Sequence, residues 1–268
     1  MRFFDKVLSI YLHSSIHVAL ACTSLVYITG LTLAITIDYT LLAFVFTMTV
    51  TGYNFVLYAG IAKWHHQSLL PNLKLIQLFS LISFLAMLYF LWQLPAALWG
   101  WIIFTGVLTL FYAVPVLPNG KNLRNTAGVK IGIIALVWAV TTVIFPIVNS
   151  NVSYDTTVLF LFLQRLLFVF VLILPFEIRD LTNDDISLGT IPQRVGIKNT
   201  KIVGILLLII VAVLEFFIQQ TTGIREASYI IFGLTGLLLY FSNPHRSRYY
   251  TAFWVEAIPI VWLIVELL

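Results

Sequence analysis

The sequence has little cysteine and little charge. Its single cysteine, Cys22, excludes a framework of disulfides and any zinc or iron–sulfur centre built from cysteine ligands. Only 10% of the 268 residues are charged, whereas soluble domains carry about 25%. This deficit excludes a disordered chain and an ordinary water-soluble globule. Together with 60% hydrophobic residues, it is typical of a polytopic membrane protein.

Long apolar runs make up most of the chain. A helix that crosses a bilayer needs about 20 apolar residues, and we read nine such runs, separated by short segments with proline, glycine and asparagine. We therefore predict an all-α membrane bundle of nine transmembrane helices that forms a single domain over residues 1–268. The predicted spans are 8–31, 39–62, 75–94, 96–117, 127–148, 155–178, 201–220, 227–242 and 249–268.

The basic residues favour one side of this layout. If the N-terminus is cytoplasmic, thirteen of the fifteen Lys and Arg residues fall on the cytoplasmic side, Arg225 falls outside and Arg165 lies within a span. Cytoplasmic segments of membrane proteins carry an excess of Lys and Arg. The pattern predicts a multi-pass protein with a cytoplasmic N-terminus and an external C-terminus, which we expect in a bacterial inner membrane. The net charge of +4 then reports orientation, and we expect no nucleic-acid partner.

Acidic residues are concentrated just after the sixth predicted span. Four acids and one arginine fall within residues 177–185. Glu177, Asp180 and Asp184 share one face if this segment is helical, and like charges on one face repel unless a cation joins them. Carboxylate oxygens suit Mg²⁺, which commonly bridges them to a substrate phosphate. We interpret the three carboxylates as a Mg²⁺ site, and the alternative interpretation is a solvated, charged loop.

The segment after the fourth predicted span is basic and lies on the same predicted side. It follows Tyr112 and contains Lys121, Arg124 and Lys130. Such cations can hold a diphosphate. Two other interpretations stay open, namely the usual positive charge of a cytoplasmic loop and contact with lipid headgroups.

These segments resemble the UbiA superfamily of intramembrane prenyltransferases. The stretches Glu-Ile-Arg-Asp-Leu-Thr-Asn-Asp at 177–184 and Gly-Thr-Ile-Pro-Gln-Arg-Val-Gly at 189–196 are similar to the second aspartate-rich motif of that family, with Glu177 in the place of the usual Asp. Tyr112, Lys121 and Arg124 are similar to the family's Tyr and Lys-Arg segment. Nine helices with acidic motifs on the cytoplasmic side also fit, so the resemblance covers nearly the whole chain.

The first aspartate-rich motif of the family is degenerate in this chain. The family pattern is Asn-Asp, two residues, Asp, three residues, Asp, at the end of the second helix. Here Asn54 is kept, whereas Phe55, Tyr58 and Ala62 stand at the three acidic positions. In the family both motifs hold Mg²⁺ against the diphosphate, so the loss of one acid set implies the loss of one metal position.

The resemblance implies a set of roles for named residues. Glu177, Asp180 and Asp184 would hold Mg²⁺, and the catalytic set would be Asp180, Asp184 and Asn54. The diphosphate of the substrate would be bound by Lys121, Arg124, Arg179 and Tyr112.

Two functions from different classes follow from these residues. The first is a divergent, Mg²⁺-dependent prenyltransferase that moves an isoprenoid chain from its diphosphate to an acceptor. The second is a catalytically inactive protein of the same fold, which binds a polyprenyl diphosphate or another lipid phosphate, or serves as a subunit of a larger membrane complex. The retained second motif favours the first function, and the missing acids of the first motif favour the second.

One charge is predicted to lie deep in the membrane. Arg165 is thirteen residues from the cytoplasmic end of the sixth span, and Glu215 is fourteen residues from the cytoplasmic start of the seventh. A lone buried guanidinium is costly in a membrane, and sequential antiparallel helices are often neighbours. We therefore predict an ion pair or a shared hydrogen-bond network between Arg165 and Glu215, with Glu256 as the alternative partner.

Overall fold

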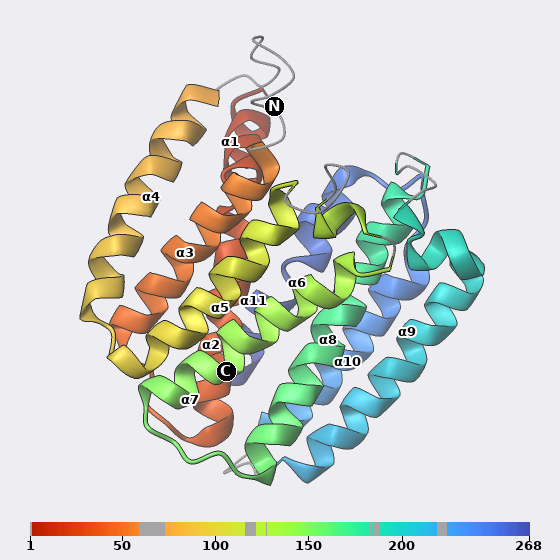
Figure 1. Cartoon of the computed structure of the whole chain (residues 1–268). Coiled ribbons are helices and arrows are strands. Elements are labelled where there is room, and N and C mark those ends of the chain that lie inside the picture. The colour runs from red at the N-terminus through yellow and green to blue at the C-terminus, as the bar shows by residue number, and fades with distance from the viewer. Residues whose placement is uncertain are drawn as a thin grey trace.

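The computed structural model of the chain describes residues 2–58, 73–115, 122–126, 128–182, 184, 188–218 and 224–268. These residues form helices and turns, and none of them lies in a strand. Inside a bilayer the backbone N–H and C=O groups have no water to bond to, so a helix, which satisfies them internally, is the favoured structure. Figure 1 shows the helices packed side by side in one bundle, with α4 at one edge and α9 at the other.

Eight helical segments in the described part of the chain are long and apolar enough to cross a membrane, which supports a multi-pass membrane protein. They are α2 (Ile16–Leu33), α3 (Tyr39–Tyr58), α4 (Leu73–Gln93), α5 (Ala96–Ala113), the continuous α6 (Lys130–Ala139), η4 (Val140–Ile144) and α7 (Phe145–Asn149), then α8 (Thr156–Asp180), α9 (Ile191–Phe217), and η6 (Tyr250–Val255) with α11 (Ile258–Leu267).

The predicted run 227–242 corresponds to α10 (Ile224–Phe241), which packs against α9 and α11. This helix is not among the eight segments that are long and apolar enough to span. The all-helical class and the multi-pass character are therefore confirmed. The count of nine spans and the orientation of the termini stay predictions.

The first predicted span, 8–31, is wrong in its boundaries. The structure has two helices there, α1 (Arg2–His13) and α2, separated by Ser14 and Ser15. Ser15 adopts a φ of 61°, which is left-handed and ends a regular helix. The side chain of Asn54 on α3 holds this break, because its Oδ1 accepts from Ser15 Oγ at 2.8 Å and its Nδ2 donates to the Ser14 carbonyl at 3.2 Å.

The helices differ strongly in how much of their surface is covered. Most of α2 and of the α6–η4–α7 segment is buried inside the bundle, whereas α4 and α5 are mostly exposed. Most exposed side chains of α4 and α5 are apolar, as Leu81, Leu85 and Ile103 illustrate. Such a surface fits contact with lipid tails rather than with water.

Two of the membrane-spanning segments contain a π-helical turn, η4 and η6. Single π-turns leave local backbone groups free to bond elsewhere and are often found near functional sites. The carbonyl of Thr142 in η4 accepts from Thr29 Oγ1 at 2.7 Å. The carbonyl of Phe253 in η6 lies 3.0 Å from His17 Nε2, so this nitrogen carries the proton. The turns thereby tie α2 to both segments.

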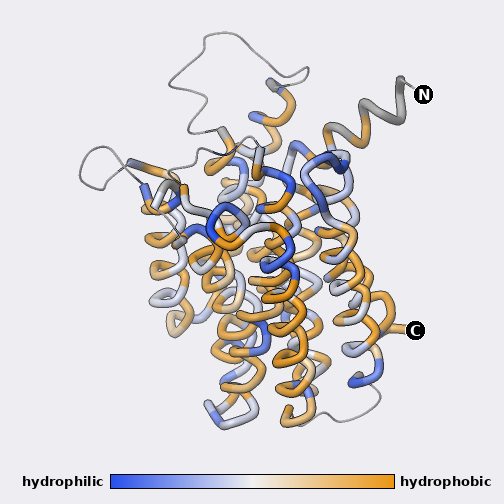
Figure 2. The backbone as a smooth tube through the Cα atoms, turned by 90° about the vertical axis from the view of Figure 1, so that its right-hand side faces the viewer, coloured by the Kyte–Doolittle hydropathy of each residue, from blue (hydrophilic) through white to orange (hydrophobic). Residues whose placement is uncertain are grey.

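Hydrophilic residues gather toward one end of the bundle. Figure 2 shows helices that are mostly hydrophobic along their length, with hydrophilic stretches concentrated at the end where α1 lies. We call this the N-terminal end. The start of α6, the end of α8 and the start of α9 all lie at the N-terminal end (Figure 1), so the polar residues that flank these helices can meet there.

Candidate functional site

A group of five ionisable side chains lies at the N-terminal end, where α6 begins and α8 ends. We call it the charged cluster, and it consists of Lys130, Glu177, Arg179, Asp180 and Asp184. Lys130 Nζ lies 2.8 Å from Glu177 Oε1 and 3.5 Å from Asp184 Oδ2. Glu177 is only 1% exposed, and a buried carboxylate without a partner would be costly. A single ammonium, that of Lys130, is therefore shared by two of the predicted metal ligands.

The remaining carboxylate of the cluster faces an arginine. Arg179 Nε donates to Asp180 Oδ1 at 2.6 Å and Arg179 Nη2 donates to Asp180 Oδ2 at 2.8 Å, which is a two-pronged pair. Arg179 Nη1 also donates to the hydroxyl of Thr251 in η6. Planar pairs of this kind are stronger than a single charged contact. They fix Arg179 and Asp180 against the segment that begins at Tyr250.

These contacts bear on the predicted Mg²⁺ site. Glu177 and Asp184 converge on one point, as ligands of one ion would, but the ammonium of Lys130 lies at that point. Within the described residues, no group of three His, Cys, Asp or Glu side chains is arranged to hold a metal ion. Lys130 would have to move before Mg²⁺ could join Glu177 and Asp184. Binding of Mg²⁺ stays a prediction.

The structure places Asn54 in a different network. Its amide contacts Ser14 and Ser15 at the α1–α2 break, and its Nδ2 also donates to Ser80 Oγ on α4 at 2.7 Å. The side chain is 3% exposed. Asn54 thus holds three helices together, and the structure does not bring it to Asp180 or Asp184.

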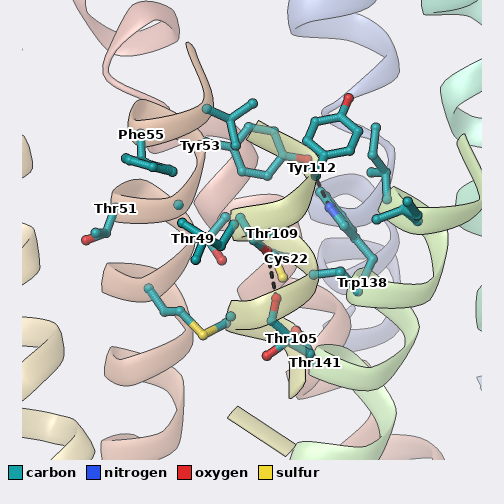
Figure 3. Close-up of a pocket in the computed structure, with 18 of the residues that line it drawn as sticks. Cys22, Thr49, Thr51, Tyr53, Phe55, Thr105, Thr109, Tyr112, Trp138 and Thr141 are labelled. Carbon is teal, nitrogen blue, oxygen red and sulfur yellow. Dashed lines mark hydrogen bonds between the residues drawn. The ribbon is translucent and has the colours of Figure 1, made fainter. Parts of the chain in front are cut away.

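A cavity of about 600 Å³ lies between α2, α3, α4, α5 and α6. Its wall is largely apolar, with Met48, Phe84, Met87 and Val137 among the lining residues. Figure 3 shows side chains from several helices pointing toward one space, with Tyr53 and Tyr112 at one end and Thr105 and Thr141 at the other. Ligand pockets of about 300–1,000 Å³ with a few polar groups are typical of small-molecule sites.

Tyr112 and Arg124 join the cavity to the charged cluster. Both line the cavity, and the hydroxyl of Tyr112 lies within electrostatic range of Arg124, Lys130, Glu177 and Asp184. Arg124 is exposed, on the short helix η3 (Leu123–Asn125). Asn122 Nδ2 donates to the carbonyl of Ala113 at 3.1 Å, which ties η3 to the end of α5. One end of an apolar cavity is thereby polar and charged.

The other predicted site residues fall into two groups. Lys121 and Ala62 lie outside the described residues. Phe55, which stands at an acidic position of the family's first motif, lines the cavity and is partly exposed. An aromatic ring thus occupies the wall where the resemblance would place a carboxylate.

A second buried polar group lies within the bundle. Arg165 is 1% exposed, its Nη1 donates to the carbonyl of Leu25 at 3.0 Å, and its Nη2 donates to Thr29 Oγ1 at 3.4 Å. Glu215, also 1% exposed, accepts from Gln164 Nε2 and lies within electrostatic range of Arg165. The structure thus places Arg165 and Glu215 within electrostatic range, but Gln164 is the residue that donates to Glu215, and Arg165 donates to Leu25 and Thr29 of α2. A direct ion pair between Arg165 and Glu215 stays a prediction.

Sequence reasoning missed the cavity, one hydrogen bond in its wall and a hydroxyl that lines it. Trp138 Nε1 donates to Tyr53 Oη at 2.9 Å across the cavity wall, and Thr141 lies at the end away from Tyr112 (Figure 3). Both residues lie in an apolar run, where aromatic and hydroxyl side chains are common in packed helices. No spacing rule separates those that line a cavity from those that pack.

Comparisons with protein-family models, with curated proteins and with solved structures give no significant match.

Proposed function

We propose that this chain is a UbiA-like membrane protein that binds an isoprenoid diphosphate, or another lipid phosphate, at the N-terminal end of its bundle. The observation that carries the proposal is the cavity of about 600 Å³ whose wall is apolar and whose one end reaches Arg124 and Tyr112. An amphipathic ligand with an anionic head and a hydrocarbon chain matches both parts. We place this end in the cytoplasm, in a nine-helix protein of a bacterial inner membrane.

Arg124 is the cation that the described site offers to a phosphate. It is exposed, and the ion pairs of the described residues involve Lys130 and Arg179 but not Arg124. Lys130 and Arg179 already neutralise carboxylates, so they contribute less net positive charge. An arginine fork suits a phosphate because it can donate two parallel hydrogen bonds. We propose that Lys121 acts beside it.

Mg²⁺ is the ion that we propose for the carboxylates of the cluster. Once a phosphate enters, Glu177, Asp180 and Asp184 would be its protein ligands, after Lys130 and Arg179 exchange their carboxylates for the phosphate. Mg²⁺ usually binds through one or two carboxylates together with substrate phosphates. Bound there, the ion would draw off negative charge from a departing diphosphate.

Prenyl transfer is the second candidate function. It is favoured by the convergence of Glu177 and Asp184 at the charged end of the cavity, as the similarity to the second motif implies. A catalytically inactive lipid-binding protein, or a subunit that binds another membrane protein, is favoured by Phe55 in the cavity wall. Binding of the lipid phosphate is common to the prenyltransferase and to the inactive lipid-binding protein, so it is tested first.

The test is isothermal titration of the purified, detergent-solubilised protein with geranyl diphosphate, with and without Mg²⁺. Gly106 lines the cavity and an added Cβ there would meet nothing within 4 Å, whereas Gly100 on the same helix has equal space but does not line the cavity. We expect Gly106→Leu to weaken binding about tenfold or more, and Gly100→Leu to leave it unchanged. Equal affinities in the two variants would place the ligand elsewhere.

The headgroup is tested with a matched pair of charge reversals. Arg124→Glu should weaken binding of geranyl diphosphate, because it places a carboxylate at the charged end of the cavity. Arg248→Glu changes the charge of the chain equally at an exposed position outside the cavity lining, so it should have little effect. Release of inorganic diphosphate from the wild-type sample would show that the chain breaks the allylic C–O bond, with water taking the geranyl group because no other acceptor is present. Release that depends on an added aromatic acceptor, together with a prenylated product, would identify a transferase.

A further inference from the structure

The end of the cavity opposite Tyr112 contains a buried hydroxyl without a partner. Thr141 lines the cavity, is 1% exposed, and its Oγ1 makes no hydrogen bond with any described residue. In Figure 3 its side chain lies beside Thr105 at the end of the space away from Tyr112. Buried hydroxyls are normally hydrogen-bonded, since an unmet donor or acceptor raises the free energy of the folded state.

Thr141 differs in this respect from the other threonines of the cavity wall. A threonine in a helix usually donates to a carbonyl of its own helix one turn earlier. Thr49 donates to the Val45 carbonyl at 2.7 Å, and Thr109 donates to the Thr105 carbonyl at 2.8 Å. Thr141 lies in the π-helical turn η4, where the regular helical spacing is interrupted. Thr142 in the same turn donates to the Trp138 carbonyl at 2.8 Å, so the missing bond is specific to Thr141, the one of the two that lines the cavity.

A positive charge lies behind this part of the wall. Arg165 donates to Thr29 Oγ1, and Thr29 in turn donates to the carbonyl of Thr142, the residue after Thr141. Arg165 also lies within electrostatic range of Cys22, which lines the same cavity. A nearby guanidinium favours a ligand atom with partial negative charge. It therefore favours an oxygen atom at this position over a hydrogen-bond donor such as an amine.

We infer that the inner end of the cavity is a hydrogen-bonding subsite for an uncharged oxygen atom of the ligand, with Thr141 as its contact. The inference rests on the proposed function and narrows its ligand class. The ligand would be a lipid phosphate whose apolar chain carries a hydroxyl or carbonyl oxygen at the end away from the phosphate. A plain hydrocarbon chain would bury the Thr141 hydroxyl without a partner.

The size of the cavity indicates a short probe. Tyr112 and Thr105 are seven residues apart on α5, about 10 Å at 1.5 Å per residue. A geranyl chain is of comparable length, so its terminal carbon would reach the neighbourhood of Thr141 when its diphosphate is at Arg124. The matched probes are geranyl diphosphate and ω-hydroxygeranyl diphosphate, which differ only by the terminal hydroxyl.

The experiment is isothermal titration of the whole 268-residue chain in detergent with each probe. We expect the wild type to bind the hydroxylated probe about three- to tenfold more tightly, the gain of one buried hydrogen bond. Thr141→Val removes the hydroxyl with little change of volume and should abolish this preference. Thr141→Ser keeps a hydroxyl at this position and should keep the preference for the hydroxylated probe. Thr109→Val is the control, because that hydroxyl is already bonded to its own helix.

The outcomes separate the subsite from the binding function. Equal wild-type affinities for the two probes, or a preference that Thr141→Val keeps, would overturn the subsite while the proposed function stands. Failure of both probes to bind would overturn the subsite and the proposed function together. Loss of the preference in Thr141→Val but not in Thr109→Val supports the subsite.

Discussion

The charged cluster and the Arg165 network each hold a cation among polar side chains, but the groups that contact the cation differ. In the cluster Lys130 contacts two carboxylates directly, and its side chain is 19% exposed. Within the bundle Arg165 is 1% exposed, and its hydrogen bonds go to a backbone carbonyl and a hydroxyl of α2, with the ring of Trp262 5.6 Å away.

The difference follows from the surroundings. At the edge of the bundle water can replace a lost partner, so an ion pair can open and its charges can meet a ligand. In the interior of the bundle water does not reach the charged group. Removal of its partner therefore leaves a buried charge without compensation. We infer that the charged cluster can exchange its contacts, whereas the Arg165 network is a permanent part of the fold. The predictions below test this distinction.

The largest effect is expected for Arg165→Met. The variant removes the donors to Leu25 and Thr29 and the cation that acts on the buried Glu215. By analogy with buried pairs that lose one partner, the free energy of unfolding should fall by about 3–5 kcal/mol. The measurement is thermal unfolding in detergent, followed by tryptophan fluorescence.

A second variant separates charge from packing in the same network. Adding Glu215→Gln to Arg165→Met removes the uncompensated negative charge and keeps an amide oxygen that can accept from Gln164. We expect the double variant to regain part of the lost stability. A double variant less stable than Arg165→Met alone would show that Glu215 does not depend on Arg165.

Lys130→Met should have a smaller effect on stability and a distinct effect on ion binding. It leaves the buried Glu177 and the nearby Asp184 without their cation, and the free energy of unfolding should fall by about 1–3 kcal/mol. Because the two carboxylates still converge, Mg²⁺ should stabilise this variant more than the wild type. Thermal unfolding with and without Mg²⁺ measures both effects.

Lys198→Met is the control for Lys130→Met, because Lys198 is an exposed cation outside the charged cluster. Its stability and its response to Mg²⁺ should match those of the wild type. If Mg²⁺ stabilises the wild type as strongly as Lys130→Met, the cluster accepts the ion without releasing Lys130.

Much of the fold could be predicted because hydropathy reports helices directly. The runs 96–117 and 155–178 correspond to α5 and α8, with ends that differ by a few residues. The break at Ser14 and Ser15 could not be found in this way, because the apolar run 8–31 continues through it. The break is held by Asn54, about 40 positions further along the chain, and only the packing of α3 against α2 brings these residues together.

For the buried charged residues, the sequence predicted the depth in the bundle better than it predicted the side chains that they contact. Matching distances from the span ends placed Arg165 and Glu215 in one layer, and both do lie in one buried region. Successive residues of a helix point roughly 100° apart, so Gln164 faces Glu215 while Arg165 faces α2. Sequence distance along the helix axis determines depth but not the direction around it. For the same reason Lys130, which belongs to the basic segment that could supply charge to a diphosphate, could not be assigned to Glu177 beforehand.

The smallest effect is expected at the contact that lies between the two regions, the hydrogen bond from Trp138 to Tyr53 in the cavity wall (Figure 3). Tyr53→Phe leaves the indole N–H without this acceptor, at a cost of about 1 kcal/mol in the free energy of unfolding. Trp138→Phe removes the donor, and a double-mutant cycle of thermal unfolding should give a coupling of about 0.5–1 kcal/mol. Because the bond joins α3 to α6, affinity for geranyl diphosphate should change little. If Tyr53→Phe weakens binding far more than it lowers stability, the hydroxyl of Tyr53 contacts the ligand, and the exchangeable, charged end of the cavity extends deeper than Arg124 and Tyr112.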